Sequence, residues 1–356
     1  YLNRVYRELE MQSALFDRSR RVEQLHWGGG TPTFISQDQM RELMDQTRRW
    51  FHLAGDDIGE YSIEIDPREA TPESVALLRR LGFNRMSLGV QDFDPMVQRA
   101  VNRIQTEAET LAVLEAARTQ GFRSLSIDLI YGLPHQTVAG FERTLDRVLT
   151  FAPDRLSIFN YAHLPQRFKP QRRIDADQLP SAPIKLDILR ATGDKLAAAG
   201  YVYIGMDHFA RPDDELALAQ RNGTLYRNFQ GYSTHADCDL IGIGVTSIGK
   251  IDNSYAQNRR ELEEYYADID AGRLPIFRGP PFAGARPRRR TSRRRAHGRQ
   301  AKHDERGDAG MDRTCALPPG RGPGRWPRSG PRSAPARAPL SGQSVPLRWN
   351  GSTGCG

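Results

Sequence analysis

The feature that most constrains the fold of this chain is a regular alternation of strand-like and helix-like segments through residues 1–279. Short runs rich in β-branched and other apolar residues predict strands at 24–27, 61–66, 85–91, 124–131, 155–161, 201–206 and 240–248. Amphipathic segments between them predict helices at 37–50, 72–81, 106–120, 138–151 and 184–199. This repetition predicts an α/β fold with a parallel sheet, and its number of units favours a closed or partly closed barrel over an open sheet.

Glycines and polar residues stand where the predicted strands end. The strand ends carry Gly28-Gly29-Gly30, Glu64-Ile65-Asp66, Gly89-Val90-Gln91, Asp128 with the residues after it, and Asn160-Tyr161-Ala162-His163. A single polar residue there is adequately explained as a cap or a satisfied core group, whereas several in register indicate a shared polar ligand. The glycine turn has neither the G-x-G-x-x-G spacing nor the Lys-Ser/Thr of a P-loop, so a nucleotide-phosphate cradle is not supported.

Residues 280–356 differ in composition, with 17 Lys/Arg against 4 Asp/Glu. This excess is larger than the net charge of +8 of the whole chain, so residues 1–279 are net negative and are not a basic nucleic-acid-binding domain. The segment has no strand or helix periodicity. Three interpretations stay open: a disordered tail, a basic arm for nucleic acid, or a change of reading frame near residue 279, which its Arg/Pro/Gly/Ala/Ser mixture favours.

The three cysteines, Cys238, Cys315 and Cys355, have neither a metal-ligand spacing nor that of a disulfide framework. We therefore expect no metal site built from this chain's own residues. No signal peptide and no long apolar run is visible, which predicts a cytoplasmic protein.

The strand-end segments resemble the barrel of radical S-adenosylmethionine enzymes of the coproporphyrinogen oxidase group. The motifs that carry the resemblance are WGGGTP at 27–32, SIEIDP at 62–67, SLGVQ at 87–91, NR at 102–103, IDLIYGLP at 127–134, NYAHLP at 160–165, GMDHFARP at 205–212 and YAQN at 255–258. The resemblance covers residues 1 to about 279. It implies a TIM-like (β/α) barrel, incomplete at its first strand, with additional substrate-side segments, followed by the low-complexity tail at 280–356.

Members of this family bind one [4Fe–4S] cluster and two S-adenosylmethionine molecules, and the resemblance assigns roles by motif. Gly29, Glu64 and Ile248 are similar to the pocket of the cluster-bound molecule. The residues that resemble the contacts of the second molecule are Gly30, Thr31, Gln91, Arg103, Asp128 and Ala162. Chemistry agrees with this assignment, because the guanidinium of Arg103 suits a methionine carboxylate and the carboxylate of Asp128 accepts hydrogen bonds from an amine or hydroxyls.

The resemblance also implies a reaction. In the family, an electron from the reduced cluster splits S-adenosylmethionine, and the resulting 5′-deoxyadenosyl radical removes hydrogen from a propionate of coproporphyrinogen III. Loss of CO₂ leaves a vinyl group, and two such steps give protoporphyrinogen IX in haem biosynthesis. The family's cluster motif, C-x₃-C-x₂-C, lies upstream of the glycine turn, whereas here no cysteine precedes residue 238. We therefore expect the first strand and the cluster loop to be missing and the chain to be inactive as written.

Other expectations concern substrate and partners. The carboxylates of coproporphyrinogen III suggest His163, His208 and Arg211 as substrate-binding residues, and the resemblance implies an electron donor as partner and a monomer. One alternative is a haem chaperone on the same barrel, and another is a nucleic-acid module that acts through the basic tail.

Overall fold

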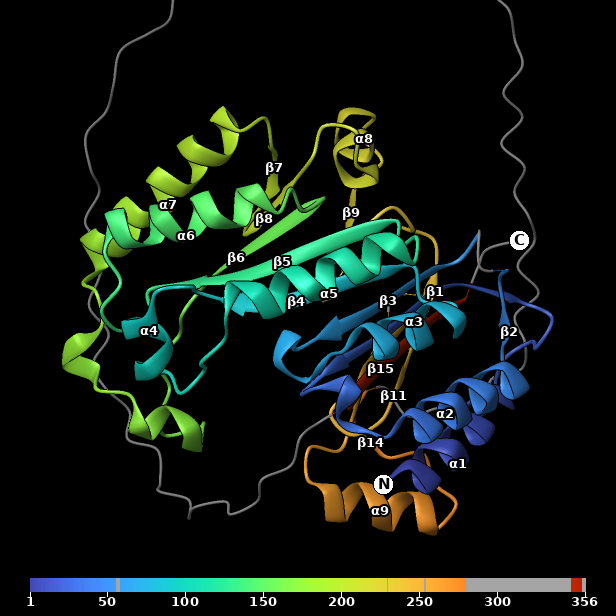
Figure 1. The fold of residues 1–356 in the computed structure, drawn as a ribbon. Helices are drawn as coiled ribbons and strands as arrows, with labels where there is room; N and C mark the ends of the chain where they lie inside the picture. Colours follow the sequence, from blue (N-terminus) through green and yellow to red (C-terminus); the bar gives the residue numbers. More distant parts are fainter. Residues whose placement is uncertain (56–57, 229, 253, 280–346, 354–356) are drawn as a thin grey trace, which may run out of the picture. The chain divides into compact units, whose positions relative to one another are not determined.

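The computed structural model describes residues 1–55, 58–228, 230–252, 254–279 and 347–353, and for 347–353 it describes the backbone alone. Its centre is a run of five parallel strands (Figure 1). These are β1 (Arg21–Gly29), β3 (Glu60–Ile65), β4 (Arg85–Gln91), β5 (Ser124–Tyr131) and β6 (Arg155–Asn160). The first five predicted strands are thereby confirmed, and β4 and β5 have the predicted bounds.

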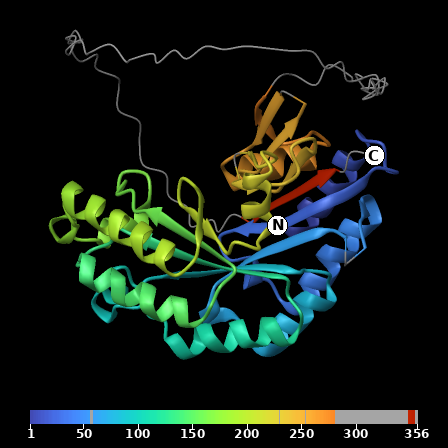
Figure 2. The same ribbon diagram turned by 90° about the horizontal axis from the view of Figure 1, so that it is seen from above.

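Four of the predicted helices connect these strands: α2 (Gln37–Trp50), α3 (Pro72–Arg80), α5 (Glu107–Thr119) and α6 (Val138–Thr150). The fifth, α7 (Ala182–Ala198), follows β6, and a further helix, α1 (Leu2–Ser13), precedes β1. Figure 2 shows helices along the outer side of the curved sheet. At the start of α2, α3 and α5, a Ser or Thr and the residue three positions later bond each other's backbone N–H, which fixes the helix starts. Among the described residues, no helix is long and apolar enough to cross a membrane.

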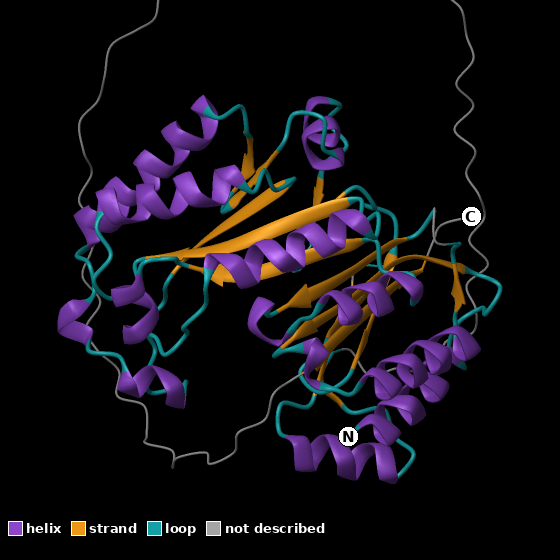
Figure 3. Cartoon of the chain, in the orientation of Figure 1, coloured by secondary structure: helices purple, strands orange, loops and turns teal. Residues whose placement is uncertain are grey.

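Shorter elements lie in the connections, where the sequence predicted loops (Figure 3). The short α-helices are α4 (Pro95–Ala100), α8 (Glu215–Arg221) and α9 (Leu262–Asp270). The 3₁₀ turns are η1 (Pro32–Phe34), η2 (Pro67–Glu69), η3 (Lys169–Arg173) and η4 (Ala176–Gln178). β2 (His52–Leu53) pairs with β1, and β9 (Tyr226–Arg227) pairs with β10 (Tyr232–Ser233) in a separate two-stranded sheet.

Beyond β6 and beyond β1 the sheet is antiparallel, which corrects the expectation of parallel strands throughout. β8 (His208–Ala210) is antiparallel to β6, and β7 (Val202–Gly205) reaches the sheet only through β8. On the other side, β11 (Asp239–Ile243), β12 (Ile248–Ile251), β13 (Ser254–Asn258) and β14 (Ile276–Arg278) form an antiparallel meander. The strand order runs from β14 to β7 without pairing of these two edges, so the described sheet is open.

The single strand predicted at 240–248 is wrong, because the chain turns between β11 and β12. Gly244 has a φ of 95° and Thr246 a φ of 64°. Positive φ ends an extended backbone, and glycine adopts it without the steric cost that other residues incur. Two short antiparallel strands replace the predicted long one.

Leu347–Thr353 forms β15 between β1 and β11 and is antiparallel to both. This segment departs from the prediction of a tail without regular structure. The reason lies in its two neighbours, since the edge of a strand presents unpaired N–H and C=O groups that accept an extended segment through its backbone. The rest of the predicted tail, 280–346 and 354–356, lies outside the described residues.

The two faces of the central strands differ, because successive side chains point to opposite sides. One face packs against the helices and is apolar, with Ile63, Leu88, Ile127 and Ile158 completely buried. The other face carries half-buried polar side chains, among them Ser62, Glu64, Ser87 and Asp128. The apolar face stabilises the fold and the polar face is available for a site.

Candidate functional site

The polar face of the central strands lines a cavity of about 290 Å³. Hydroxyl and charged side chains recur along its wall: Gln24 and His26 of β1, Glu60, Ser62 and Glu64 of β3, Arg85 and Ser87 of β4, Ser124, Ser126 and Asp128 of β5, and Arg155 and Ser157 of β6. The interior of a TIM barrel is ordinarily filled by bulky apolar side chains. A polar, open interior therefore indicates a ligand site.

The glycine turn after β1 is joined to Glu64. The Gly29 amide donates to Oε2 of Glu64 at 3.1 Å, and Nε2 of His26 lies 3.2 Å from Oε1 of the same carboxylate. Nδ1 of His26 lies 2.8 Å from the hydroxyl of Ser62. A Cβ atom at Gly28 would come within 2.4 Å of the His26 ring and 2.7 Å of the Glu64 carboxylate. A side chain at Gly28 would therefore displace the His26 ring and the Glu64 carboxylate, and the Gly29 amide holds that carboxylate at the carboxyl end of β3.

Asp128 shares the cavity with Glu64. The Ser87 hydroxyl donates to Oδ2 of Asp128 at 2.9 Å. Burial raises the pKa of Asp128 to about 6, and the charge of Glu64 acts in the same direction, while hydrogen bonds from Ser87 and Ser157 oppose the rise. A carboxylate held in this way accepts further hydrogen bonds readily, which suits hydroxyl or ammonium groups of a ligand.

Gln91 and Arg103 meet at Gly89. Gln91 ends β4 with a φ of 69°, and its side-chain amide would crowd a Cβ atom placed at Gly89. Arg103 donates to the Gly89 carbonyl at 2.6 Å and lies 3.0 Å from the Asp66 carboxylate. Its Nε is buried without a partner, and burial lowers the pKa of Arg103. This incompletely paired guanidinium is suited to a carboxylate of a ligand.

The remaining predicted residues lie in turns around the same end of the sheet. Gly30 is exposed and Thr31 precedes η1. Ala162 is exposed after β6, and its carbonyl accepts a hydrogen bond from Nε2 of Gln171 at 3.0 Å. Ile248 opens β12, next to Ser247, whose buried hydroxyl has no partner. The structure thus joins Gly29 with Glu64 and Gln91 with Arg103, whereas Ala162 and Ile248 stand on separate connections.

The three predicted substrate residues are not together. His163 follows β6 and lies 3.0 Å from the Tyr161 hydroxyl, and His208 lines the cavity with its Nδ1 buried and unpartnered. Burial lowers the pKa of His208. Arg211 is exposed, its amide donates to the Asp154 carbonyl and its side chain faces Asp213 at 3.6 Å. The antiparallel direction of β8 carries Arg211 to the amino end of β6, apart from His163, and its role in substrate binding stays a prediction.

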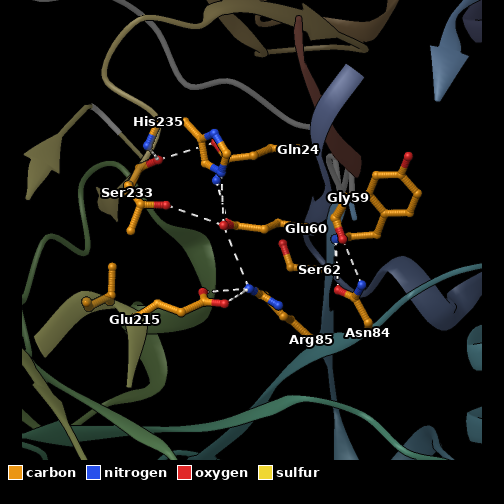
Figure 4. A network of polar contacts seen from close by, with 12 residues as sticks. Gln24, Gly59, Glu60, Ser62, Asn84, Arg85, Glu215, Ser233 and His235 are labelled. Atoms are coloured by element: carbon orange, nitrogen blue, oxygen red, sulfur yellow. Dashed lines mark hydrogen bonds and ion pairs between the residues drawn. The ribbon is translucent and has the colours of Figure 1, made fainter. Parts of the chain in front are cut away.

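A second polar cluster, which the sequence did not predict, lies at the amino ends of the same strands (Figure 4). Glu60 lies 2.9 Å from Nε2 of His235, and Arg85 donates to both oxygens of Glu215 at 2.6 and 2.5 Å. Burial works against the charged form of Glu60, but hydrogen bonds from His235 and Gln24 and the charge of Arg85 lower its pKa to about 2. The available signal was an arginine at the start of two predicted strands, Arg85 and Arg155.

The site residues fit an adenosyl ligand but not an iron–sulfur cluster. The cavity lined by Glu64 and Asp128 offers room and hydrogen-bond acceptors for a polar molecule, and the Nε of Arg103 and the hydroxyl of Ser247 are buried without partners. Among the described residues, no group of three or more His, Cys, Asp or Glu side chains is arranged to hold a metal ion. Cys238 is half-buried and hydrogen-bonds His235, which contacts Glu60 at the amino end of β3, away from the glycine turn.

Comparison with known proteins identifies the relatives of this fold. The model of the Radical SAM superfamily matches residues 3–148. The oxygen-independent coproporphyrinogen III oxidase of Pseudomonas aeruginosa is 60% identical over 279 residues, which are 78% of this chain and 61% of that protein. The enzyme of the same name from Escherichia coli is 52% identical over 279 residues, covering 78% of this chain and 60% of its own length.

The solved structure of the Escherichia coli coproporphyrinogen III oxidase, described as a radical SAM enzyme, superposes with a TM-score of 0.76 at 52% identity. The match covers 78% of this chain and 64% of that one. The chain therefore spans less than two thirds of the relatives it matches. Over the matched residues the chain is similar to the oxygen-independent coproporphyrinogen III oxidases, and its residues 3–148 match the Radical SAM superfamily.

Proposed function

We propose that residues 1–279 carry the S-adenosylmethionine-binding and substrate-side groups of an oxygen-independent coproporphyrinogen III oxidase. The observation that carries this proposal is the Glu64 carboxylate, which the Gly29 amide holds at 3.1 Å beside Asp128 in a polar cavity. The family's chemistry acts on two propionates of coproporphyrinogen III in the absence of oxygen. S-adenosylmethionine, when bound, supplies the hydrogen-abstracting group of that chemistry.

Each residue of the site has a role that its own geometry permits. Glu64 accepts hydrogen bonds from the ribose hydroxyls of the first adenosyl molecule, and Gly29 and Ile248 contact the same molecule. Asp128 and Gln91 bind polar groups of the second molecule, and Arg103 binds its methionine carboxylate through the side on which Nε is unpartnered. Gly30, Thr31 and Ala162 contact that second molecule through their backbone. These residues bind and orient the ligands and exclude water, which is the protein's part in radical chemistry.

We also infer that this chain, by itself, has no oxidase activity. A [4Fe–4S] cluster needs several thiolate ligands, and the 356 residues hold three cysteines of which none forms a C-x₃-C-x₂-C motif. Anaerobic reconstitution with iron and sulfide, followed by electron paramagnetic resonance, tests this inference. The expected spectrum lacks a stoichiometric [4Fe–4S] signal, and the appearance of that signal would contradict the inference.

The proposal is tested by calorimetric titration of the full chain with S-adenosylmethionine. Glu64→Gln removes the charge that receives the ribose hydroxyls and keeps the volume, and we expect at least a tenfold rise in Kd, or about 1.4 kcal/mol. The matched control is Glu69→Gln, the same change at an exposed position of η2, which is expected to leave the Kd within twofold. Equal Kd values for the two variants would refute the role of Glu64, and no binding by the unaltered chain would refute the proposal.

A further inference from the structure

The connection between β6 and α7 carries a concentration of positive charge at the candidate-site end of the sheet. Four basic residues stand within seven positions, Arg167, Lys169, Arg172 and Arg173, and all four side chains belong to exposed residues. Within the described part of the chain, none of the four enters an ion pair. The two acidic residues that follow are Asp175 and Asp177, and Asp175 is occupied as the cap of η4.

This basic connection is fixed in place next to a predicted site residue. Gln171 of η3 donates to the Ala162 carbonyl at 3.0 Å and accepts from the Leu164 amide at 2.5 Å. Nε of Arg172 donates to the Pro165 carbonyl at 3.0 Å. These bonds fold η3 back onto the end of β6, so its cations stand beside Ala162.

A further cation borders the same place from α7. Nζ of Lys185 donates to the Tyr161 carbonyl at 3.3 Å, and the end of its side chain lies against Gly132 at the end of β5. The His135 amide donates to the Gln178 carbonyl at 2.9 Å, which joins the connection after β5 to the residues after η3. The carboxyl ends of β5 and β6 are therefore bordered by cations from two elements.

Apolar side chains are exposed among these charges. Phe168 is 52% exposed and Leu164 is 39% exposed, and both belong to the same connection. A surface that combines uncompensated cations with exposed apolar groups suits a ligand that has an apolar body and several carboxylates. Coproporphyrinogen III is such a ligand, since it carries four propionates on a macrocycle.

We propose that the β6–α7 connection, through Arg167, Lys169, Arg172 and Arg173 with Lys185, binds the carboxylates of the tetracarboxylate macrocycle, and that Phe168 packs against its apolar body. The inference rests on the proposed function and adds the residues that select the substrate. It replaces Arg211, which lies at the opposite end of β6. Gln171 acts as a positioning residue, because it holds η3 against Ala162 without presenting a charge.

The test is a fluorescence titration of the full chain with coproporphyrin III, the oxidised macrocycle with the same four propionates. The variant Lys169→Gln/Arg173→Gln removes two exposed cations. In the described part of the chain, neither side chain donates a hydrogen bond to the backbone, whereas that of Arg172 does. We expect saturable binding by the unaltered chain and at least a tenfold rise in Kd for this variant. The salt dependence of its binding is expected to be weaker, because fewer ionic contacts remain.

The matched control is Arg143→Gln/Arg147→Gln, which removes two positive charges from exposed positions of α6 and is expected to leave the Kd for coproporphyrin III within twofold. S-adenosylmethionine titration of the same variants separates the two proposals. If both variants bind S-adenosylmethionine and have equal Kd values for coproporphyrin III, this inference is overturned. The proposed function is then unaffected. If the unaltered chain does not bind coproporphyrin III, the inference is overturned. If the unaltered chain binds neither coproporphyrin III nor S-adenosylmethionine, both proposals are overturned.

Discussion

The two ends of the central strands are built differently. At the amino ends, opposite charges pair across the chain: Glu60 with His235, Arg85 with Glu215, and Arg155 with Asp214 at 2.8 Å. At the carboxyl ends, glycine amides, hydroxyls and carboxylates predominate. There the Nε of Arg103 and the hydroxyl of Ser247 are buried without partners, as the Nε of Arg85 is at the amino ends, and the Asp128 carboxylate accepts hydrogen bonds from hydroxyls.

The difference separates stability from ligand binding. Ion pairs at the amino ends join strands β3, β4 and β6 to residues 214–235, far along the chain, and so hold the segment after β7 against the sheet. Unpartnered polar atoms at the carboxyl ends cost stability unless a ligand pairs with them. Under the proposed function, the ligand site lies at the carboxyl ends of the strands and the ion pairs lie at the amino ends, as in parallel barrels.

The largest effect is expected from Arg85→Met at the amino end. The Arg85 side chain is 9% exposed and neutralises both Glu60 and Glu215. Its removal leaves two carboxylates close together, one of them largely buried, and we expect the free energy of unfolding to fall by about 3 kcal/mol. Urea denaturation followed by circular dichroism measures this change. S-adenosylmethionine affinity of the folded variant should remain within about threefold, and a selective loss of affinity would break the separation between the two ends.

A smaller and pH-dependent effect is expected from His235→Ala. Hydrogen bonds to Cys238 and to Glu60 raise the pKa of His235 to about 10. A raised histidine pKa means that the charged ring stabilises the fold fully below its unfolded pKa of 6.5, and that this contribution is lost as the pH rises toward about 10. We expect the variant to be less stable by about 2 kcal/mol at pH 6 and by clearly less at pH 9.5.

Denaturation curves at the two pH values, for both proteins, check this expectation. Glu60→Gln is the companion variant, because it removes the charge of one of the two partners of His235 and should reduce the same pH dependence, while the hydrogen bond with Cys238 remains. A destabilisation by His235→Ala that is equal at pH 6 and pH 9.5 would show that the ring contributes packing alone.

The sequence predicted the carboxyl-end site better than the amino-end cluster, for a physical reason. Glu64, Gln91 and Asp128 were found because strand periodicity and parallel direction bring the ends of successive strands together. The partners of the amino-end cluster are 130 positions apart for Arg85 and Glu215, and 175 apart for Glu60 and His235. No local pattern specifies such pairs, since they depend on how the segment after β7 returns to the sheet.

The same limit explains why the sequence did not indicate at which end of β6 Arg211 lies and why the strand predicted at 240–248 is wrong. Both lie after β7, where the chain changes from parallel crossovers to antiparallel strands. Direction reverses in β8, so a residue that follows it stands at the opposite end from the residues that follow β6. Apolar composition identified 201–206 and 240–248 as strands but carried no information about their direction.

The smallest expected change of stability is a gain, from Asp128→Asn at the carboxyl end. Burial raises the pKa of Asp128 to about 6 from its ordinary 3.8, so the folded state holds this proton more tightly than the unfolded state does. Stability is therefore lost as the pH rises from about 4 to about 6, and the charged group is a net cost at pH 7. Asparagine has no such cost and is expected to raise the free energy of unfolding by about 1 kcal/mol at pH 7 and by nothing measurable at pH 4.

Under the proposed function, the same substitution weakens S-adenosylmethionine binding, because an amide is a poorer acceptor than a carboxylate. Stability gained together with affinity lost is the signature of a group kept for a ligand, and a variant that loses stability at pH 7 would place Asp128 with the structural charges of the amino end instead.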